Sequence, residues 1–401
     1  MGDAVASDAR VAVDAATGGG PDPMLLPEAD GQRAAAVAPA VEPGASYLDP
    51  SSGARVWRVT GPDAPEANTG AHHDYSNGPN QISGALDDGS HILLVYLDGV
   101  GHRLVDFTPG VGVSNWRAPV IAPASDLSFT FSSVAGTAHL AYVVASDGSL
   151  HRIDARANVV MDGDGFPVAG FGTWLQQDQR DEWFVSISGG EAVVAWNRST
   201  GARRERSFAG LDEPYLEHEG QTVLINTGGT ATPPLWDLAG DTLRAVTSPT
   251  RIFHSGAMRG YWTAADVDIG GGRVPYYRLS AASATADPVL DYVGYQSAFH
   301  MAGQWLQGDL GAAPTLEQWV LLSFYGGFES GGPLVDRAIG LFRLDGSGGF
   351  RFLAHSYTSA GAGYWELPRA TISPDGTLVM FDSDRGGVRG DVFVIEMPLR
   401  D

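Results

Sequence analysis

The sequence predicts an all-β fold, a seven-bladed β-propeller closed by an N-terminal strand that completes the last blade. Three observations support this prediction. Glycine accounts for 53 of the 401 residues, while runs of helix-forming residues are few. Short strand-like segments separated by turns repeat with a period of roughly 45–50 residues, which is typical of propeller blades. The last repeat reaches the C-terminus with too few strands, whereas a spare strand precedes the first repeat.

The clearest repeat lies near the C-terminus. There the Asp375-Gly376 turn separates Ala370–Ser373 from the apolar segment Leu378–Phe381. An Asp-Gly turn between two extended runs is the strongest short-range signal of a β-hairpin. In chain order the seven repeats contain these predicted strands: Gln81–Leu86, His91–Leu97 and Arg103–Phe107; His139–Ala145 and Leu150–Ala155; Glu182–Ser188, Ala192–Asn197 and Arg203–Phe208; Thr222–Asn226 and Pro234–Leu238; Tyr261–Ala265 and Val274–Leu279; Gln318–Phe324 and Ile339–Leu344; Leu378–Phe381 and Asp391–Glu396.

The spare strand is Ala54–Thr60. As the outer strand of the last blade it would join the two ends of the chain and remove an exposed sheet edge. An irregular β-sandwich and two stacked β domains are the alternatives to a propeller.

The N-terminal segment differs from the rest of the chain. Residues 1–46 are rich in Asp, Ala, Gly and Pro and contain no aromatic residue, which predicts a disordered linker. The propeller is then expected over residues 47–401. A linker of this kind often follows an export signal, so we expect a secreted, periplasmic or surface-lipoprotein location.

The charge excludes several partners. The formal net charge is −22, so the chain should repel nucleic acid and anionic membranes. All 25 basic residues are arginines, and without lysine neither a Walker-type phosphate loop nor Schiff-base chemistry can form.

There is no cysteine, which removes disulfides and thiolate chemistry. No apolar run is long enough to span a membrane, and we expect a monomer.

Propeller topology predicts which residues share a face. The first strand of each blade is reached by the connection from the previous blade, so residues near the start of these strands should line one central funnel. Five of the ten histidines are expected there, although a structural role in a loop is the alternative for each. The expected set comprises His72, His73, Tyr75, Trp116, Trp174, Gln176, Tyr215, His254, Arg259, Gln296, His300, His355, Tyr364, Trp365 and Arg369.

One segment resembles a known family. Tyr364–Gly376 reads Tyr-Trp-Glu-Leu-Pro-Arg-Ala-Thr-Ile-Ser-Pro-Asp-Gly and resembles the last blade of propellers of the oligogalacturonate lyase and TolB type. The wider group includes ulvan lyases, which cleave uronate-containing polysaccharides by β-elimination. Ser373–Gly376 alone is common to many propellers. The resemblance implies a polysaccharide lyase acting on an anionic polysaccharide.

The expected funnel residues suit that chemistry. β-Elimination removes the weakly acidic proton at C5 of a uronate, once the charge of its carboxylate is neutralised. His73 is the candidate base and His72 its neighbour and orienter. The acid would be Tyr75 or Tyr364, and the carboxylate clamp Arg259 or Arg369.

Aromatic residues at the funnel would bind sugar rings. Trp116, Trp174 and Trp365 are the candidates for stacking, with Gln176 and Tyr215 completing the substrate-binding set. Packing between blades is the alternative role for each tryptophan.

A divalent metal is a further candidate for charge neutralisation. His254, His300 and His355, with Gln296, supply imidazole and amide ligands that suit Mn²⁺, Zn²⁺ or Ca²⁺. The resemblance also implies a histidine-and-glutamine metal site. However, the family places a glutamine and two histidines in one tight cluster, and here only Gln296 and His300 lie close in sequence.

Two other functions stay open from the sequence. One is a non-catalytic propeller, secreted or surface-anchored, that binds glycan or protein. The other is hydrolysis by paired carboxylates among Asp74, Asp212 and Glu366. Fold alone does not decide among them.

Overall fold

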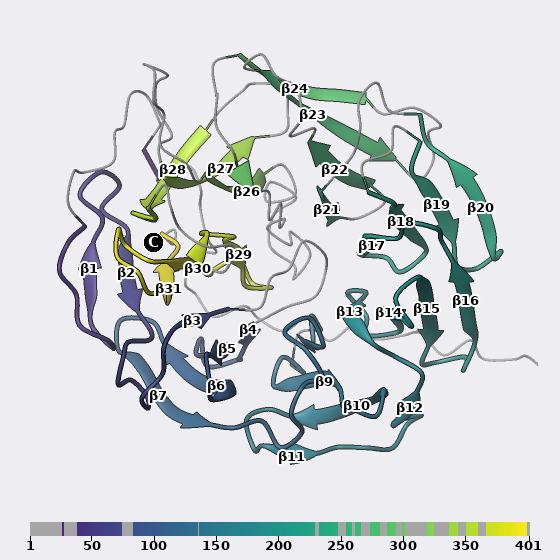
Figure 1. Ribbon diagram of the computed structural model, residues 1–401, viewed down its shortest axis with the longest axis horizontal. Helices are drawn as coiled ribbons and strands as arrows, with labels where there is room; N and C mark the ends of the chain where they lie inside the picture. Colours follow the sequence, from purple (N-terminus) through teal and green to yellow (C-terminus); the bar gives the residue numbers. More distant parts are fainter. Residues whose placement is uncertain are drawn as a thin grey trace, which may run out of the picture.

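The chain forms an all-β structure whose sheets surround a common centre (Figure 1). The computed structural model describes residues 26–27, 38–73, 83–134, 136–228, 232–247, 254–258, 261–265, 273–280, 287–293, 299–300, 319–324, 337–343, 350–359 and 366–398. The strands in these ranges form seven antiparallel sheets, which fits the predicted seven-bladed propeller.

The first two blades contain irregular edges. In blade one the inner strand is split in two, and in blade two a pair of short strands shares the outer edge. From inside to outside, blade one consists of β3 (Ala71–His72) with β4 (Ser83–Ala85), β5 (His91–Leu97), β6 (Gly101–Thr108) and β7 (Gly112–Arg117). Blade two consists of β8 (Phe129–Phe131), β9 (Leu140–Val144), β10 (Ser149–Asp154), and β11 (Val159–Val160) with β12 (Val168–Ala169).

Blades three to six are four-stranded and follow chain order from inside to outside. Blade three contains β13 (Thr173–Gln177), β14 (Trp183–Ser188), β15 (Ala192–Asn197) and β16 (Arg203–Ser207). Blade four contains β17 (Glu213–Leu216), β18 (Thr222–Asn226), β19 (Pro234–Asp237) and β20 (Thr242–Ala245). Blade five contains β21 (His254–Met258), β22 (Tyr261–Ala265), β23 (Arg273–Ser280) and β24 (Asp287–Val293). Blade six contains β25 (Phe299–His300), β26 (Trp319–Phe324), β27 (Ala338–Arg343) and β28 (Phe350–His355).

The N-terminal strand closes the last blade, as predicted. Blade seven runs outward through β29 (Thr371–Ile372), β30 (Leu378–Ser383), β31 (Asp391–Glu396), β2 (Arg55–Arg58) and β1 (Ser46–Leu48). The register pairs Trp57 with Val394. Figure 1 shows β1 and β2, in purple, outside β31, in yellow. Strand β1 adds a fifth strand that the sequence did not reveal.

The core lies between neighbouring blades rather than in one central mass. Phe129 and Phe131 of blade two pack with Ile92 and Leu94 of blade one. Because the middle strands are covered on both faces, β5 is buried along most of its length. Each fully buried side chain of this size stabilises the fold by about 1.5–3 kcal/mol. Among the described residues no helix is long and apolar enough to cross a membrane.

The alternation of the strands defines two faces of the propeller. The segments that join one blade to the next and the turns between second and third strands lie on one face, here called the connection face. The turns between first and second strands lie on the opposite face, here called the hairpin face. Residues 98–100, 118–128 and 384–390 therefore belong to the connection face, and residues 178–182 belong to the hairpin face.

Candidate functional site

Three ring side chains form a row across blade one at the connection face. The register pairs His72 with Tyr96, and Tyr96 with His102. Directly opposite residues on neighbouring strands project to the same side of a sheet. Accordingly, the ring centroids of His72 and Tyr96 lie 4.8 Å apart, and those of Tyr96 and His102 lie 5.0 Å apart.

Asp126 joins the two histidines of this row. It lies in the connection from blade one to blade two. Its Oδ2 is 3.4 Å from Nε2 of His72, and its Oδ1 is 3.7 Å from Nε2 of His102. One carboxylate thus lies within ion-pair distance of two imidazoles, an arrangement that serves proton transfer in many active sites.

Charge keeps Asp126 ionised despite its surroundings. Burial acts to raise the pKa of Asp126, but the hydrogen bond from His72 and the charges of His72, His102 and Arg369 outweigh it and lower the pKa. Burial, followed by the carboxylates of Asp126 and Asp98, raises the pKa of Tyr96. The phenol of Tyr96 therefore keeps its proton at neutral pH.

A pocket of about 370 Å³ opens beside the row. Tyr96, His102 and Asp126 line it, together with small and proline residues of the connection between blades one and two. His72 is not among the lining residues, and its side chain is nearly fully buried. The polar residues that line this pocket are Tyr96, His102, Arg103, Ser125 and Asp126.

His73 belongs to a second, fully buried polar group. Its backbone N–H donates to Oδ1 of Asp382 over 2.9 Å, and its Nδ1 lies 2.8 Å from the same oxygen. Its Nε2 donates to the carbonyl of Arg369 over 3.0 Å. Nη2 of Arg369 donates to Oδ2 of Asp382, also over 3.0 Å. His73, Arg369 and Asp382 are all 0 % exposed. They join the inner edge of blade seven to that of blade one.

The structure brings together part of the predicted catalytic set. His72 pairs with Asp126, while His73 and Arg369 belong to the second group. The two groups are neighbours, since the charge of Arg369 lowers the pKa of Asp126. A general base needs a nitrogen directed at the substrate proton, whereas both ring nitrogens of His73 face protein acceptors. The role of base therefore stays a prediction for His73.

Sequence reasoning missed four residues of these groups: Tyr96, His102, Asp126 and Asp382. Tyr96 and His102 flank the Asp98-Gly99 turn symmetrically, so hairpin pairing could have placed their rings side by side. Asp382 follows an apolar strand run, where a carboxylate is conspicuous. For Asp126, in an irregular connection, the sequence carries no comparable signal.

The predicted sugar-binding residues take other positions. Trp116 was expected at the start of blade two, but it lies on β7, the outer strand of blade one, and packs on the core near Trp57. The prediction was wrong because β7 continues through Arg117 and the next blade starts only at Phe129.

Trp174, Gln176 and Tyr215 lie on inner strands but are buried between blades three and four. Nε1 of Trp174 and Nε2 of Gln176 both donate to the carbonyl of Pro214, over 3.0 and 2.7 Å. Oε1 of Gln176 accepts from the backbone of Leu216 over 2.8 Å. The Tyr215 hydroxyl donates to Glu213. These contacts match the alternative role, packing between blades.

Of the four predicted metal ligands, only His355 has a described side chain. His355 ends β28, the outer strand of blade six, and not an inner strand as the funnel requires. Its backbone N–H and Nδ1 lie 2.9 and 3.3 Å from Oδ2 of Asp49. His254 and His300 begin or end inner strands β21 and β25, but their side chains lie outside the described residues. So do Gln296, Arg259, Tyr75, Tyr364 and Trp365.

His355 has one property of a metal ligand. Its Nε2 is buried and has no hydrogen-bond partner among the described residues, while Nδ1 faces a carboxylate. Histidines that bind metals commonly donate their other nitrogen to such a group. Within the described ranges, however, no three His, Cys, Asp or Glu residues form a group that could hold a metal ion. The described residues thus do not make up the predicted site.

Comparisons with known proteins agree with the architecture. No protein-family model matches the sequence, and no curated protein matches it either. Among solved structures, an oligogalacturonate lyase in complex with manganese superposes with a TM-score of 0.61 at 14% identity, covering 88% of this chain and 96% of that one. An oligogalacturonate lyase from Vibrio parahaemolyticus gives 0.60 at 13% identity, with coverage of 88% and 96%. At these identities the likeness shows the fold, which this chain shares with the oligogalacturonate lyase propellers.

Proposed function

We propose that the protein is a polysaccharide lyase that cleaves a uronate-containing polysaccharide by β-elimination. The observation that carries this proposal is the row of His72, Tyr96 and His102 held by one carboxylate, Asp126, beside a pocket on the connection face. The likeness of the fold to oligogalacturonate lyases supports it. The net charge of −22 requires that an anionic substrate meet positive charge locally.

Each residue of the row receives a role. His102, in place of the sequence candidate His73, takes the proton from C5 of the uronate, because it lines the pocket. The C5–H electrons form the C4=C5 double bond as the C4–O bond breaks, and the Tyr96 hydroxyl gives its proton to the leaving oxygen. Asp126 orients His102 and stabilises its charged form, while His72 orients Asp126. His73, with Asp382 and Arg369, holds the inner strand that carries His72.

Neutralisation of the substrate carboxylate is assigned to positive charge on the connection face. The predicted clamp Arg259 lies outside the described residues, and a divalent ion would serve the same purpose by Lewis-acid stabilisation of the enolate. Because the described residues do not form a metal site, no step is assigned to one. Cleavage of an environmental polysaccharide also agrees with the proposed location outside the cytoplasm.

The geometry further predicts the stereochemistry of the substrate. Tyr96 and His102 are neighbours on one wall of the pocket, so base and acid reach the sugar from the same side. Such a pair favours syn elimination, in which the C5 proton and the C4 oxygen lie on the same face of the ring. D-glucuronate and D-mannuronate have this configuration, whereas D-galacturonate and L-guluronate do not. We therefore expect cleavage of glucuronan or polymannuronate in preference to pectate.

The test is a panel of uronate polysaccharides: pectate, alginates of both kinds, ulvan, glucuronan and glycosaminoglycans. The unsaturated product absorbs in the ultraviolet, and formation is followed with and without added divalent cations. His102→Gln and Tyr96→Phe should each lower the rate by about 10²–10⁴-fold, the usual contribution of general acid–base catalysis. His151→Gln is the matched control, because His151 forms a similar pair with Asp162 (3.0 Å) on β10, away from the pocket.

Two results would overturn the proposal. Absence of product on the whole panel would exclude a lyase and favour the non-catalytic propeller. Unchanged activity in His102→Gln, with cleavage present, would move the chemistry elsewhere on the face.

A further inference from the structure

A second pocket on the connection face is lined by three arginines. It has a volume of about 400 Å³ and lies against the turn between β30 and β31 in blade seven. Arg58, Arg385 and Arg389 line it, together with Asp384, Asp391 and residues 38–42 of the N-terminal segment. In a chain whose net charge is −22, three guanidinium groups around one pocket call for an explanation.

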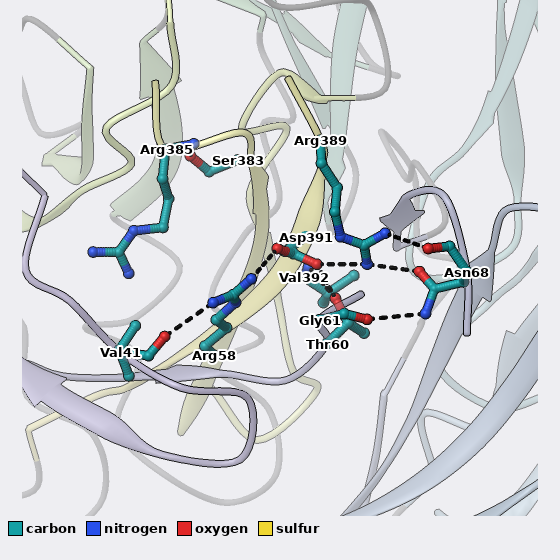
Figure 2. A network of polar contacts seen from close by, with 10 residues as sticks. All are labelled: Val41, Arg58, Thr60, Gly61, Asn68, Ser383, Arg385, Arg389, Asp391 and Val392. Carbon is teal, nitrogen blue, oxygen red and sulfur yellow. Dashed lines mark hydrogen bonds and ion pairs between the residues drawn. The ribbon is translucent and has the colours of Figure 1, made fainter. Parts of the chain in front are cut away.

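Two of the arginines share a carboxylate. Nη2 of Arg58 lies 2.7 Å from Oδ2 of Asp391, and Nη2 of Arg389 lies 2.8 Å from Oδ1. Figure 2 shows this network, which extends from Arg389 to Asn68. Thr60 also donates to Asp391. Both oxygens of Asp391 are therefore used by groups around the pocket.

Arg385 stands apart from this network in Figure 2. Its Nη2 donates to the carbonyl of Pro39, and its guanidinium lies 5.0 Å from the ring centroid of Tyr47 and 5.3 Å from that of Phe393. Across the described part of the chain it has no ion pair. Asp384, the acid next to Arg385 in the sequence, is occupied by other donors. Its Oδ1 accepts from the backbone N–H groups of Ser359 and Gly386, and its Oδ2 accepts from the Ser359 hydroxyl.

The pocket has more donors than acceptors. Nε of Arg58, Nη1 of Arg385 and Nε of Arg389 are all buried and have no hydrogen-bond partner among the residues the structure describes. Burial lowers the pKa of Arg385 most, and the charge of Arg58 also lowers it, while Tyr47, Tyr357 and Asp391 act to raise it. Buried donors without acceptors and neighbouring cations together mark a place for an anion. Glu42 also lines the pocket but is solvent-exposed.

We propose that this arginine pocket binds the carboxylate of a uronic acid unit. A planar carboxylate matches the fork of a guanidinium in a way that a neutral sugar does not. The aromatic rings that hold Arg385 restrict its side chain, so little conformational entropy is lost on binding. This site differs from the Tyr96–His102 pocket, which lies between blades one and two.

This proposal rests on the proposed function, because the choice of a uronate as the bound group comes from the lyase reaction. Both pockets are on the connection face, and the two blades meet where Gly390 accepts from the backbone N–H of Ala71, beside His72. A polysaccharide cleaved at blade one could thus extend over blade seven. The arginine pocket would hold a uronate several sugar units from the cleaved bond.

The experiment measures binding of sodium glucuronate by calorimetry at low ionic strength, with glucose, sodium sulfate and sodium acetate in parallel. We expect glucuronate to bind, and acetate more weakly, while glucose does not. Arg385→Gln should weaken binding of glucuronate about tenfold or more, the loss of one charged hydrogen-bonded contact. Arg156→Gln, which changes an exposed arginine elsewhere, should leave it unchanged.

A second pair of variants changes an exposed position, so that folding should be unaffected. Val388 lines the pocket and is fully exposed, so Val388→Glu places a competing carboxylate there without disturbing the core. We expect Val388→Glu to weaken glucuronate binding about tenfold and Val388→Gln to leave it unchanged. Equal binding in all variants, stronger binding of sulfate than of glucuronate, or equal binding of glucose would overturn the proposal. Since no cleavage is measured, failure of the lyase assay would leave this result intact.

Discussion

Carboxylates on the two faces of the propeller meet opposite surroundings: Asp126 is half-buried beside cations, whereas Asp178 and Asp181 are buried. On the connection face Asp126 lies between two histidines, and its pKa is lowered by positive charge in spite of burial. On the hairpin face of blade three, burial raises the pKa of Asp178 to about 7 and that of Asp181 to about 6. Within the described ranges Asp178 accepts only from backbone N–H groups, those of Glu182 at 2.7 Å and Trp183 at 3.2 Å. The direction of each pKa shift therefore follows from two differences together, the depth of burial and the presence of cations.

The carboxylates of the hairpin face join neighbouring blades, whereas Asp126 on the connection face lies beside a pocket. Asp181 accepts from the hydroxyls of Tyr142 (2.9 Å) and Ser132 in blade two, and Asp178 packs against Gly220 of blade four. Gly220 has φ +74°, and a Cβ there would lie 2.4 Å from Oδ2 of Asp178. The hairpin face thus fits blades together closely, while the connection face leaves pockets beside its charged groups.

The largest expected effect follows from breaking the buried ion group at the inner edge of the connection face. Arg369→Leu leaves Asp382 buried without its guanidinium partner, and removal of one partner of a buried pair costs about 3–5 kcal/mol of unfolding free energy. Chemical denaturation measures it. Arg156→Gln, which breaks the exposed pair with Asp88 at 3.2 Å, should change stability by less than about 1 kcal/mol. Similar losses for both would contradict the burial argument.

The next effect concerns the sign of pH dependence on the hairpin face. The pKa of Asp178 in the folded protein, about 7, lies above its usual value of 3.8, so the folded state binds the proton more tightly than the unfolded state. The ionised, buried Asp178 therefore lowers the free energy of unfolding. This loss is present in full above pH 7 and disappears as the pH falls toward 4. Asp178→Asn should therefore stabilise the protein at pH 8, on the order of 2–4 kcal/mol, and hardly at all at pH 4.

Denaturation of both proteins across this pH range tests the prediction. A larger gain for Asp178→Asn at pH 4 than at pH 8 would reverse the sign and refute it. The cleavage proposed for blade one should be unchanged, since Asp178 belongs to the other face.

A smaller effect is expected at the contact between blades two and three. Tyr142→Phe removes a hydroxyl that donates to Asp181, and a hydrogen bond to a charged group contributes about 1.5–3 kcal/mol. The loss should be greatest at alkaline pH, where Asp181 is ionised, and should shrink when Asp181 is protonated. A pH-independent loss would show that packing of the ring, rather than the hydroxyl, is responsible.

The smallest change in stability is expected for Asp126→Asn, although its effect on cleavage should be large. The contacts of Asp126 are long, at 3.4 and 3.7 Å, so we expect a loss of about 1 kcal/mol at pH 7. Because the pKa of Asp126 is lowered in the folded state, this contribution disappears as the pH falls below about 4. Parallel measurements of stability and product formation check the contrast with Asp178→Asn.

Periodic features of the fold were predictable. Alternating apolar segments and Asp-Gly turns identified most strands, and the missing strand of the last repeat led to the closure of β2 on β31. The register within a hairpin follows from the turn, which is local. Trp116 was misplaced because the end of an outer strand and the start of a connection carry no local signal.

The site was predictable only where residues adjoin an inner strand. His72, His73 and Arg369 were identified this way, whereas Asp126 and Asp382 were not, because their partners are far away in sequence: Asp382 lies 309 residues from His73. Likewise, Trp174, Gln176 and Tyr215 lie on inner strands as expected, but the packing of blade three on blade four buries them.

By itself the sequence determined the repeat, the closure of the ring and the excess of negative charge, since strand periodicity and composition are properties of neighbouring residues. The tertiary structure decided which carboxylates meet cations. Asp126 and Asp178 look alike in sequence, and only the approach of other blades makes one an ionised partner of histidines and the other a buried acid. Electrostatic interactions depend on distance in space, and that distance is set by the packing of blades around the ring.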